Sequence, residues 1–476
     1  MPILRDADPR LRLLASRPAP ARPAYVLYFC QAYRRPTDNL ALAYAIEMAN
    51  ERRLPCLVYE SIRPDYPYAS DRFHTFVLEG ARETARVLQE RGIAYAFFLP
   101  RSREEARGMV ARLSQRAALV VSDDSPTFLD AHNNSAAAKS HAPYVTVDDN
   151  SVVPLALFPK QEYAARTIRP KVHRLLPTYL KPHADPEARV SPLRELDLPF
   201  APIDFSTADI ASLVLACPID HDVPPVAEFP GGAAKAEGRL TAFLANRLDG
   251  YATDRNEPSR DATSHLSPYL HFGMISARKV ALAARAAADR RDVPAESIDA
   301  FLEQLLVRRT LAFNFARENP RHQSFDELPN WARDTLQKHA VDARPSLVDA
   351  AALERAESPD EVWNAAQLEL RTRGIIHNYV RMLWGKLVLT WTETPREAHR
   401  LLVHLNDKWA LDGRDPDGYT NIGWCFGLHD RPWPERPIFG TVRTMTSRSA
   451  RAKLDLDEYL RCAHAKDWRK TGLFER

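Results

Sequence analysis

The chain has 476 residues, 45% of them hydrophobic and 27% charged, and its formal net charge is only +3. This composition is typical of a soluble globular protein, and the length exceeds what one small core needs, so we expect two domains. The sequence argues against a membrane protein, since no apolar run reaches about 18 residues, and the N-terminus lacks the apolar stretch of a signal peptide.

The five cysteines are scattered along the chain and form no CxxC pair. This spacing argues against disulfides, zinc and iron–sulfur clusters, so we expect no metal and a reducing, cytoplasmic location. The small net charge gives no sign of nucleic-acid binding by itself.

Residues 25–150 alternate between short apolar runs and longer segments with helical periodicity. This alternation predicts a Rossmann-like α/β domain with a doubly wound parallel sheet. No G-x-G-x-x-G and no P-loop occurs, so a standard dinucleotide or ATP site has no support. The expected strands are 25–30, 55–59, 94–99, 118–122 and 144–147, and the expected helices are 39–53, 72–91 and 103–116.

Residues 151–235 are punctuated by prolines, which disfavour long helices over most of this stretch and indicate a long connection. Helical periodicity dominates from about residue 236, so the second domain should be all-α. We therefore expect an α/β domain at 1–150, a linker at 151–235 and a helical domain at 236–476. The expected helices are 236–249, 275–290, 296–317, 360–372, 374–392 and 395–407.

Tryptophan is concentrated in the last quarter of the chain, in the stretches 375–391 and 406–424, among Asn, Arg and Asp. Oxidisable rings in such surroundings suggest redox chemistry around a bound aromatic cofactor. Further on, basic residues surround Trp433 and Phe439, a mixture that can grip phosphates and stack bases. Charge alone favours a solvated surface for them. They are Arg431, Arg436, Arg443, Arg448, Arg451 and Lys453.

Several motifs follow one another in order along nearly the whole chain: K-Q-E-Y-A-A-R-T-I-R-P-K at 160–171, D-R-N at 254–256, L-S-P-Y-L-H-F-G at 266–273, W-N-A-A-Q at 363–367, the two tryptophan stretches, and H-D with E-R-P at 429–437. Together they resemble the photolyase/cryptochrome family, and within it the class II cyclobutane pyrimidine dimer (CPD) photolyases. The resemblance implies an antenna domain and a helical domain with a folded-over FAD. The implied partner is UV-damaged double-stranded DNA, bound by a monomer. The antenna domain would hold a deazaflavin, another chromophore or none.

The resemblance implies a flavin pyrophosphate clamp made by Tyr251 and the segment 263–268. Hydroxyls and N–H groups before a helix suit an anion, and the same T-S-x-L-S-P motif also fits an ordinary helix N-cap. Its residues assigned to the clamp are Thr263, Ser264, Leu266 and Ser267.

Beside the flavin ring, Arg381 and Asp412 are similar to the family's charged pair, in which a bidentate contact can orient a planar ring. An ordinary interhelical salt bridge is the alternative. Asn406 matches the asparagine that faces flavin N5, where an amide can donate or accept. The other residues assigned to the flavin are Phe301, Arg308, Gly413 and Asn378, the last at a position where class II members usually carry Gly.

Three tryptophans match the class II wire that carries electrons from the surface to the flavin. Trp384 and Trp391 are seven residues apart, which predicts one helix face and a separation of about 10 Å along the axis. Trp363 would come from a neighbouring helix. Core packing is the alternative for aromatic residues at helical spacing.

The resemblance also assigns residues to the lesion and to the DNA around it. Trp424 resembles the ring that packs against the flipped-out lesion, and Met382 the sulfur beside it. Trp433 and Arg443 match residues that fill the gap left in the duplex. This match changes the interpretation of the basic segment from a solvated surface to a DNA contact.

The chain departs from the family where the substrate should be met. The family signature E-E-L-[IV]-V-[RW]-[RK]-E reads E-Q-L-L-V-R-R-T at 303–310, so Gln304 replaces the glutamate that hydrogen-bonds the dimer. Gln has no carboxylic proton, although its NH₂ can still donate. We expect a CPD photolyase with altered efficiency. The alternatives are a photolyase for another lesion such as the (6-4) photoproduct, a cryptochrome-like photoreceptor, and a non-photochemical flavoprotein.

Overall fold

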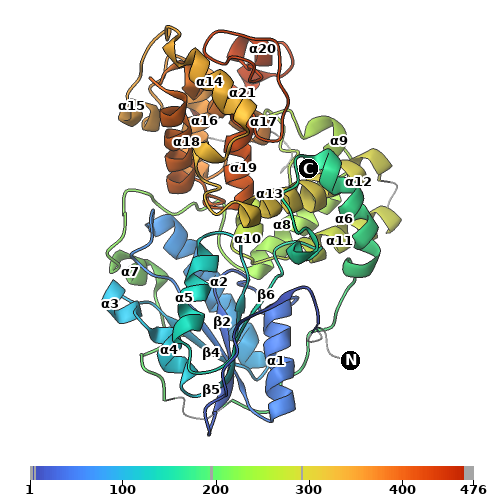
Figure 1. Ribbon diagram of the computed structural model, residues 1–476, viewed down its shortest axis with the longest axis vertical. Helices are drawn as coiled ribbons and strands as arrows, with labels where there is room; N and C mark the ends of the chain where they lie inside the picture. The colour runs from blue at the N-terminus through green and yellow to red at the C-terminus, as the bar shows by residue number, and fades with distance from the viewer. Residues whose placement is uncertain (1–3, 5–6, 193–196, 291–292, 466–476) are drawn as a thin grey trace. The chain divides into compact units, whose positions relative to one another are not determined.

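The structure, a computed structural model, describes residues 4, 7–192, 197–290 and 293–465. Contacts divide the chain into two compact units (Figure 1). The first comprises Met1–Lys160, Val172–Thr241 and Leu266–Ala284, and the second comprises Gln161–Lys171, Ala242–His265 and Arg285–Arg476. This division groups segments by contact rather than by chain order, and the domain boundaries expected near 150 and 235 stay predictions.

The first unit is built on a six-stranded sheet with the order β1-β6-β5-β2-β3-β4. Neighbouring strands from β6 to β4 are parallel, and β1 runs antiparallel to β6. The predicted parallel α/β sheet is therefore confirmed. The strands are β1 Leu11–Ala15, β2 Tyr25–Cys30, β3 Cys56–Ser61, β4 Ala94–Phe98, β5 Ala117–Asp123 and β6 Tyr144–Val147.

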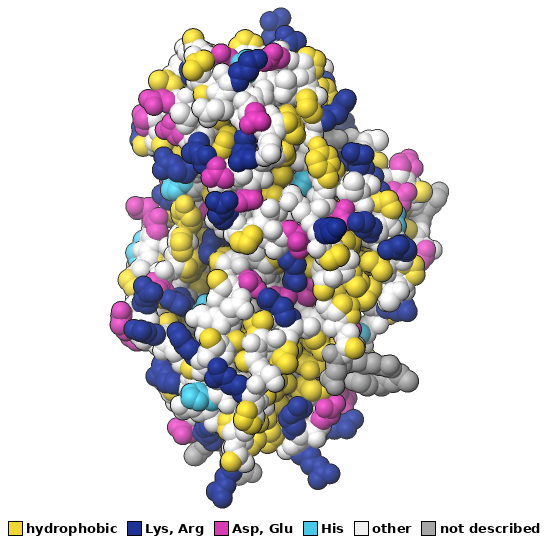
Figure 2. Space-filling view, viewed as in Figure 1, with side chains coloured by type: hydrophobic (Ala, Val, Ile, Leu, Met, Phe, Trp, Pro, Cys, Tyr) yellow, Lys and Arg dark blue, Asp and Glu magenta, His cyan; other side chains and the backbone are white. Residues whose placement is uncertain are grey.

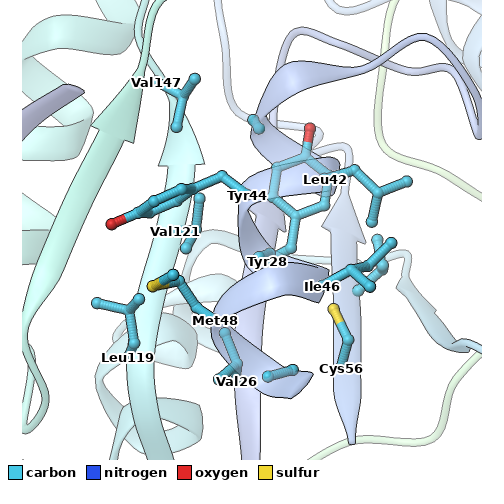
Figure 3. Packing of buried hydrophobic residues seen from close by; sticks show 14 of the residues in the cluster. Val26, Tyr28, Leu42, Tyr44, Ile46, Met48, Cys56, Leu119, Val121 and Val147 are labelled. Atoms are coloured by element: carbon cyan, nitrogen blue, oxygen red, sulfur yellow. The ribbon is translucent and has the colours of Figure 1, made fainter. Parts of the chain in front are cut away.

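The central strand β2 is buried on both faces, which is why its sequence is a continuous apolar run. Val26 and Tyr28 pack with helix α1 (Leu40–Arg52), as Figure 3 shows, and Tyr25 and Leu27 pack on the opposite face. The other helices that begin in this unit are α2 Asp71–Glu90, α3 Arg103–Ala106, α4 Met109–Ser114, α5 Phe128–Lys139, α7 Ile210–Leu215, α8 Ala233–Asn246, α10 Ser267–His271 and α11 Ala277–Arg290.

The sequence does not predict strand β1 or helix α5, and it predicts one helix where the structure has α3 and α4. Strand β1 lies at the sheet edge and is only partly buried, and α5 mixes Asn, His and Ser with Ala, so neither has a strong apolar period. The segment 103–116 forms two short helices instead of one. Gly108, with a φ of +71°, separates them, because a left-handed residue cannot continue an α-helix.

The proline-rich stretch contains one long helix, α6 (Ala165–Tyr179), which the prolines had argued against. Ile168, Val172 and Leu176 form its buried stripe, whereas Pro170 and Pro177 lie on the exposed face. Proline has no backbone N–H, so the carbonyl four residues before each proline loses its helical donor. On the exposed face that carbonyl can bond to water, so the helix tolerates both prolines.

The second unit is helical, as predicted. The segment expected as one helix at 296–317 consists of α12 and α13 joined by a π-helical turn, Glu303–Arg308, and such turns often occur at functional sites. The helices are α9 Tyr251–Asp254, α12 Ala295–Leu302, α13 Arg309–Glu318, α14 Asn330–Lys338, α15 Ala350–Glu354, α16 Glu361–Arg373, α17 Asn378–Leu387, α18 Pro395–Trp409, α19 Pro416–Cys425, α20 Ser447–Arg451 and α21 Leu456–Ala465.

Candidate active site

Three tryptophans of the second unit form one continuous stack. The rings of Trp363 and Trp384 are nearly parallel at 6.2 Å between centroids, and Trp391 meets Trp363 edge-on at 5.5 Å. Trp363 therefore lies between the other two. All three are buried, with exposed fractions of 0%, 1% and 5% for Trp363, Trp384 and Trp391. Such contacts provide a short path for an electron.

The stack differs from the predicted arrangement in one respect. Helix α17 ends at Leu387 and a 3₁₀ turn, Val388–Thr390, precedes Trp391, so Trp384 and Trp391 do not share a face of one α-helix. The contribution of Trp363 from another helix, α16, agrees with the prediction. Its indole N–H donates to the Trp384 carbonyl at 2.9 Å, which fixes the two rings relative to each other.

One turn before Trp384 on the same helix, Arg381 meets Asn406 of α18 and Asp412 of the following loop. Its two terminal nitrogens donate to Asn406 Oδ1 at 3.1 Å and Asp412 Oδ1 at 3.3 Å. The predicted pair thus forms, but the guanidinium bridges two partners instead of gripping one carboxylate at two points. The Asn406 amide nitrogen donates to Asp407 at 3.2 Å, so both ends of this amide are held.

Close backbone packing holds this cluster together at Gly413. A Cβ atom at Gly413 would lie 2.8 Å from the Asn406 carbonyl oxygen and 2.9 Å from that of Ala410, closer than real contacts allow. Only glycine therefore fits between the end of α18 and the loop that carries Asp412.

Acidic residues that the prediction missed surround the cluster. Burial raises the pKa of Asp407, which accepts from the Tyr419 hydroxyl at 2.9 Å and the Arg414 N–H at 3.0 Å. Burial and the neighbouring Asp415 raise the pKa of Asp417, whose partner is Arg309 at 3.3 Å. The motif D-G-R-D-P-D-G-Y at 412–419 was the available signal, since so many acids in one turn need cations and donors nearby.

The aromatic part of the predicted cofactor site also assembles. Tyr251 and Phe301 meet edge-on at 5.3 Å, and both contact Phe243, which the prediction missed. The Arg255 guanidinium lies 5.9 Å from the Tyr251 ring, and its buried Nε has no hydrogen-bond partner among the described residues. A partly buried guanidinium with one buried, unpaired N–H suits an anionic group.

His377 precedes α17 and is held as a neutral imidazole. Its Nδ1 accepts from the Tyr379 N–H at 3.3 Å, and its Nε2 lies 3.1 Å from the Arg255 carbonyl, so Nε2 carries the proton. Burial lowers the pKa of His377 to about 4, in agreement with this tautomer. Asn378, the first residue of α17, is exposed.

The segment 263–268 is ordered around His265, whose φ is +52°. His265 Nε2 lies 2.5 Å from Asp261, and Arg247 donates to Asp261 and to the Thr263 carbonyl. Thr263 and Ser264 belong to the second unit, whereas Leu266 and Ser267 belong to the first, where Leu266 precedes α10 and makes no side-chain cap. Their role as a phosphate clamp stays a prediction.

Gln304 and Arg308 lie on the π-helical turn. Arg308 stacks over Trp424 at 5.2 Å from the ring centroid and lies 3.4 Å from Glu303, which Arg169 grips at two points. The structure thus places Arg308 beside the ring predicted to face the lesion. The Gln304 side chain is partly exposed.

Met382 and Trp424 are both partly exposed, on α17 and α19. Lys386 of α17, which the prediction missed, is buried and donates to the Cys425 carbonyl of α19 at 3.0 Å. Burial lowers the pKa of Lys386. A cation at the last carbonyl of α19 is favoured by the helix dipole and holds the end that carries Trp424.

Trp433 and Arg443 are brought together as predicted. Arg443 and Arg431 stack on Trp433 at 5.0 and 5.1 Å, and all three lie in the loop between α19 and α20. Arg451 instead pairs with Glu361 and Asp457. Acidic residues are interspersed with basic ones on the face shown in Figure 2. The basic residues that contact Trp433 are Arg431 and Arg443.

Two further observations concern the chain as a whole. The cysteines, Cys30, Cys56, Cys217, Cys425 and Cys462, all lie in the described part of the chain, and each is buried and free. Among the described helices, none has the length and apolar character that crossing a membrane requires.

Comparisons with known proteins agree with this architecture. Residues 26–189 match the DNA photolyase family model. The deoxyribodipyrimidine photo-lyase of Methanothermobacter thermautotrophicus is 37% identical over 455 residues, covering 95% of this chain and 97% of the relative. That of Oryza sativa subsp. japonica is 37% identical, covering 91% and 86%.

Among solved structures, a cryptochrome of Synechocystis sp. has the same fold, with a TM-score of 0.70 at 16% identity, covering 92% of this chain and 88% of that one. A class III photolyase of Agrobacterium tumefaciens gives a TM-score of 0.68 at 18% identity, covering 93% and 87%. The sequence similarity over almost the full length of the curated relatives shows that this chain belongs to the photolyase/cryptochrome family.

Proposed function

We propose that this protein is a light-dependent DNA repair enzyme of the class II type that splits cyclobutane pyrimidine dimers by electron transfer from reduced FAD. The observation that carries the proposal is the tryptophan stack, which reaches through one turn of α17 the cluster of Arg381, Asn406 and Asp412. The relatives named deoxyribodipyrimidine photo-lyases support the same activity.

The residues present suit FAD. Arg255 keeps a buried N–H free for a phosphate, Tyr251 and Phe301 offer an aromatic wall, and the Asn406 amide is fixed beside Arg381. When bound and reduced, FAD would supply the electron that light promotes to the dimer. The protein's part is to orient the ring with Arg381 and Asn406 and to deliver electrons to the site through the tryptophans.

On the lesion side, Trp424 with Arg308 over its face would pack against the extruded dimer, and Met382 would lie beside it. Gln304 would donate its NH₂ to the dimer in place of a carboxylic acid. Because an amide cannot give up a proton, stabilisation of the split dimer would rest more on the Arg308 charge.

A second chromophore in the first unit is part of the proposal, with a deazaflavin as the expected type. A solved archaeal photolyase of the same fold, from Sulfolobus tokodaii, is described as containing two FAD molecules, with a light-harvesting role implied for one of them. We propose that the protein acts as a monomer on double-stranded DNA.

The test is repair of defined lesions. Photoreduced protein should split thymine dimers in a duplex back to two thymines under blue light and not in the dark. Gln304→Glu should raise the CPD repair yield about fivefold, the factor that one hydrogen bond of about 1 kcal/mol provides. Dimers left intact by protein that holds photoreduced FAD would exclude CPD repair. Repair of (6-4) photoproducts alone would favour the alternative suggested by Gln304, a (6-4) photolyase.

Trp433→Ala should weaken binding of dimer-containing duplex about tenfold, because one stacked aromatic contributes about 1–3 kcal/mol. Binding of undamaged duplex should change little, since it has no gap to fill. Fluorescence anisotropy with labelled duplexes at fixed salt measures both. Arg285→Gln, at an exposed position of α11, serves as the control, and an equal loss for both duplexes would contradict the wedge role.

A further inference from the structure

The loop 430–443, here called the Trp433 loop, is closed by its own backbone. The Trp433 N–H donates to the Thr441 carbonyl at 2.8 Å, and Arg436 and Gly440 exchange two backbone hydrogen bonds of 2.8 Å. Trp433 and Arg443 therefore move with the rest of the loop as one piece. What holds this piece against the helices determines whether both side chains stay in place.

The loop is attached to α14 and to the 3₁₀ turn His339–Val341 that follows it. The Thr441 N–H donates to Thr335 Oγ1 at 2.9 Å, and the Ile438 N–H donates to Asp342 Oδ2 at 2.7 Å. Gly440 packs so closely on this surface that a Cβ atom would lie 2.1 Å from Thr335 Oγ1. The same Cβ atom would lie 2.9 Å from His339 Cδ2, and Asp342 contacts His339, so the contacts of Gly440 and Ile438 both lie next to His339.

His339 joins the helix side to the loop side through both ring nitrogens. Nδ1 lies 2.6 Å from Asp342, and Nε2 lies 2.7 Å from Glu435 of the loop. An ionised carboxylate only accepts hydrogen bonds, so both nitrogens must donate, which only the imidazolium can do. The hydrogen bonds to Glu435 and Asp342 raise the pKa of His339.

The other charged groups around His339 interact mainly with its two carboxylate partners and their backbone. Lys338 donates to Glu435 at 2.7 Å, and Arg344 donates to the carbonyls of Asp342 at 2.6 Å and His339 at 3.4 Å. The hydrogen bond from Lys338 is the main cause that lowers the pKa of Glu435, and the one from the Ile438 N–H is the main cause that lowers the pKa of Asp342. Both carboxylates therefore stay charged when His339 titrates.

We propose that His339, as an imidazolium between Asp342 and Glu435, is a positioning residue that holds the Trp433 loop in its DNA-contacting conformation and makes damaged-DNA binding depend on pH. The proposal rests on the DNA-repair function inferred above. A group with a raised pKa contributes stability that is fully present below its unfolded pKa of about 6.5 and is lost as the pH rises through the folded value. His429, which borders the loop, has its pKa lowered to about 4 by burial and so does not titrate in this range.

The affinity for dimer-containing duplex should fall about fivefold from about pH 6 to about pH 9, because a partly exposed ion pair contributes up to about this factor. His339→Gln should remove this dependence and bind at every pH as the wild type does at high pH. His173→Gln, at an exposed histidine of α6, should keep the wild-type dependence. Photoreduction of bound FAD should be the same in all three proteins.

Two results would overturn the proposal. One is an unchanged pH dependence in His339→Gln. The other is a His339 pKa at or below 6.5, read from the ¹⁵N shifts of its ring. The indole N–H signal of Trp433, assigned with Trp433→Phe, should shift together with the His339 titration, and it needs no DNA. If the wild type binds no damaged DNA at any pH, the repair function fails. The titrations of His339 and of the Trp433 indole still decide whether His339 holds the Trp433 loop.

Discussion

Trp363→Phe is expected to abolish light-driven reduction of bound FAD while leaving FAD content unchanged. Trp363 is the only one of the three stacked tryptophans that contacts both others, so its loss opens the path in the middle. Phenylalanine is much harder to oxidise, and a step that is uphill by about 2.7 kcal/mol already slows a reaction about a hundredfold. The measurement is the rate at which flavin absorbance falls under blue light with an external reductant.

Trp409→Phe provides a matched control for this variant. Trp409 is also buried in the second unit and its indole N–H also donates, to Glu354 at 3.1 Å, but it has no place in the stack. Both substitutions thus remove a similar ring and one hydrogen bond. Equal photoreduction in Trp363→Phe and Trp409→Phe would mean that the stack is core packing and not an electron path.

Arg381→Met is expected to release FAD and to destabilise the second unit. The substitution leaves the Asp412 carboxylate and the Asn406 amide oxygen without their shared donor, and breaking a largely buried ion pair costs about 3 kcal/mol. FAD retained after gel filtration should fall at least about tenfold, which corresponds to about 1.4 kcal/mol of binding free energy. Denaturant unfolding of the FAD-free protein measures the loss of stability separately.

Arg381→Lys separates charge from geometry. Lysine keeps the charge but cannot reach two partners with a planar fork, so FAD retention should be intermediate. Full FAD retention and unchanged unfolding in Arg381→Met would show that the bridge to Asn406 and Asp412 does not serve the flavin.

Residue type and local periodicity were sufficient for much of the fold. The buried strands β2, β3, β5 and β6 are continuous apolar runs because helices cover both faces of the sheet, and such runs are visible without any structure. Strand β1 carries no such signal, since an edge strand is covered on one side only and its pairing partner, β6, lies more than a hundred residues away.

The motifs also identified the family, because many of them follow one another in the family's order along nearly the whole chain. They placed Arg381 with Asp412, Trp433 with Arg443, and Trp363 with two other tryptophans, and each of these groups is in contact in the structure. Spacing was misleading where a helix did not continue, at Gly108, at the π-helical turn Glu303–Arg308 and at the 3₁₀ turn before Trp391.

By itself, then, the sequence determined the family, the alternation that builds the sheet, and the set of residues available for redox and DNA chemistry. The tertiary structure alone decided that Trp363 is the middle ring, that Arg381 divides its two nitrogens between Asn406 and Asp412, and that His339 meets Glu435 across 96 positions of chain. These contacts depend on where helices end and cross. Local propensity sets the period of a helix, but packing between distant segments sets its neighbours.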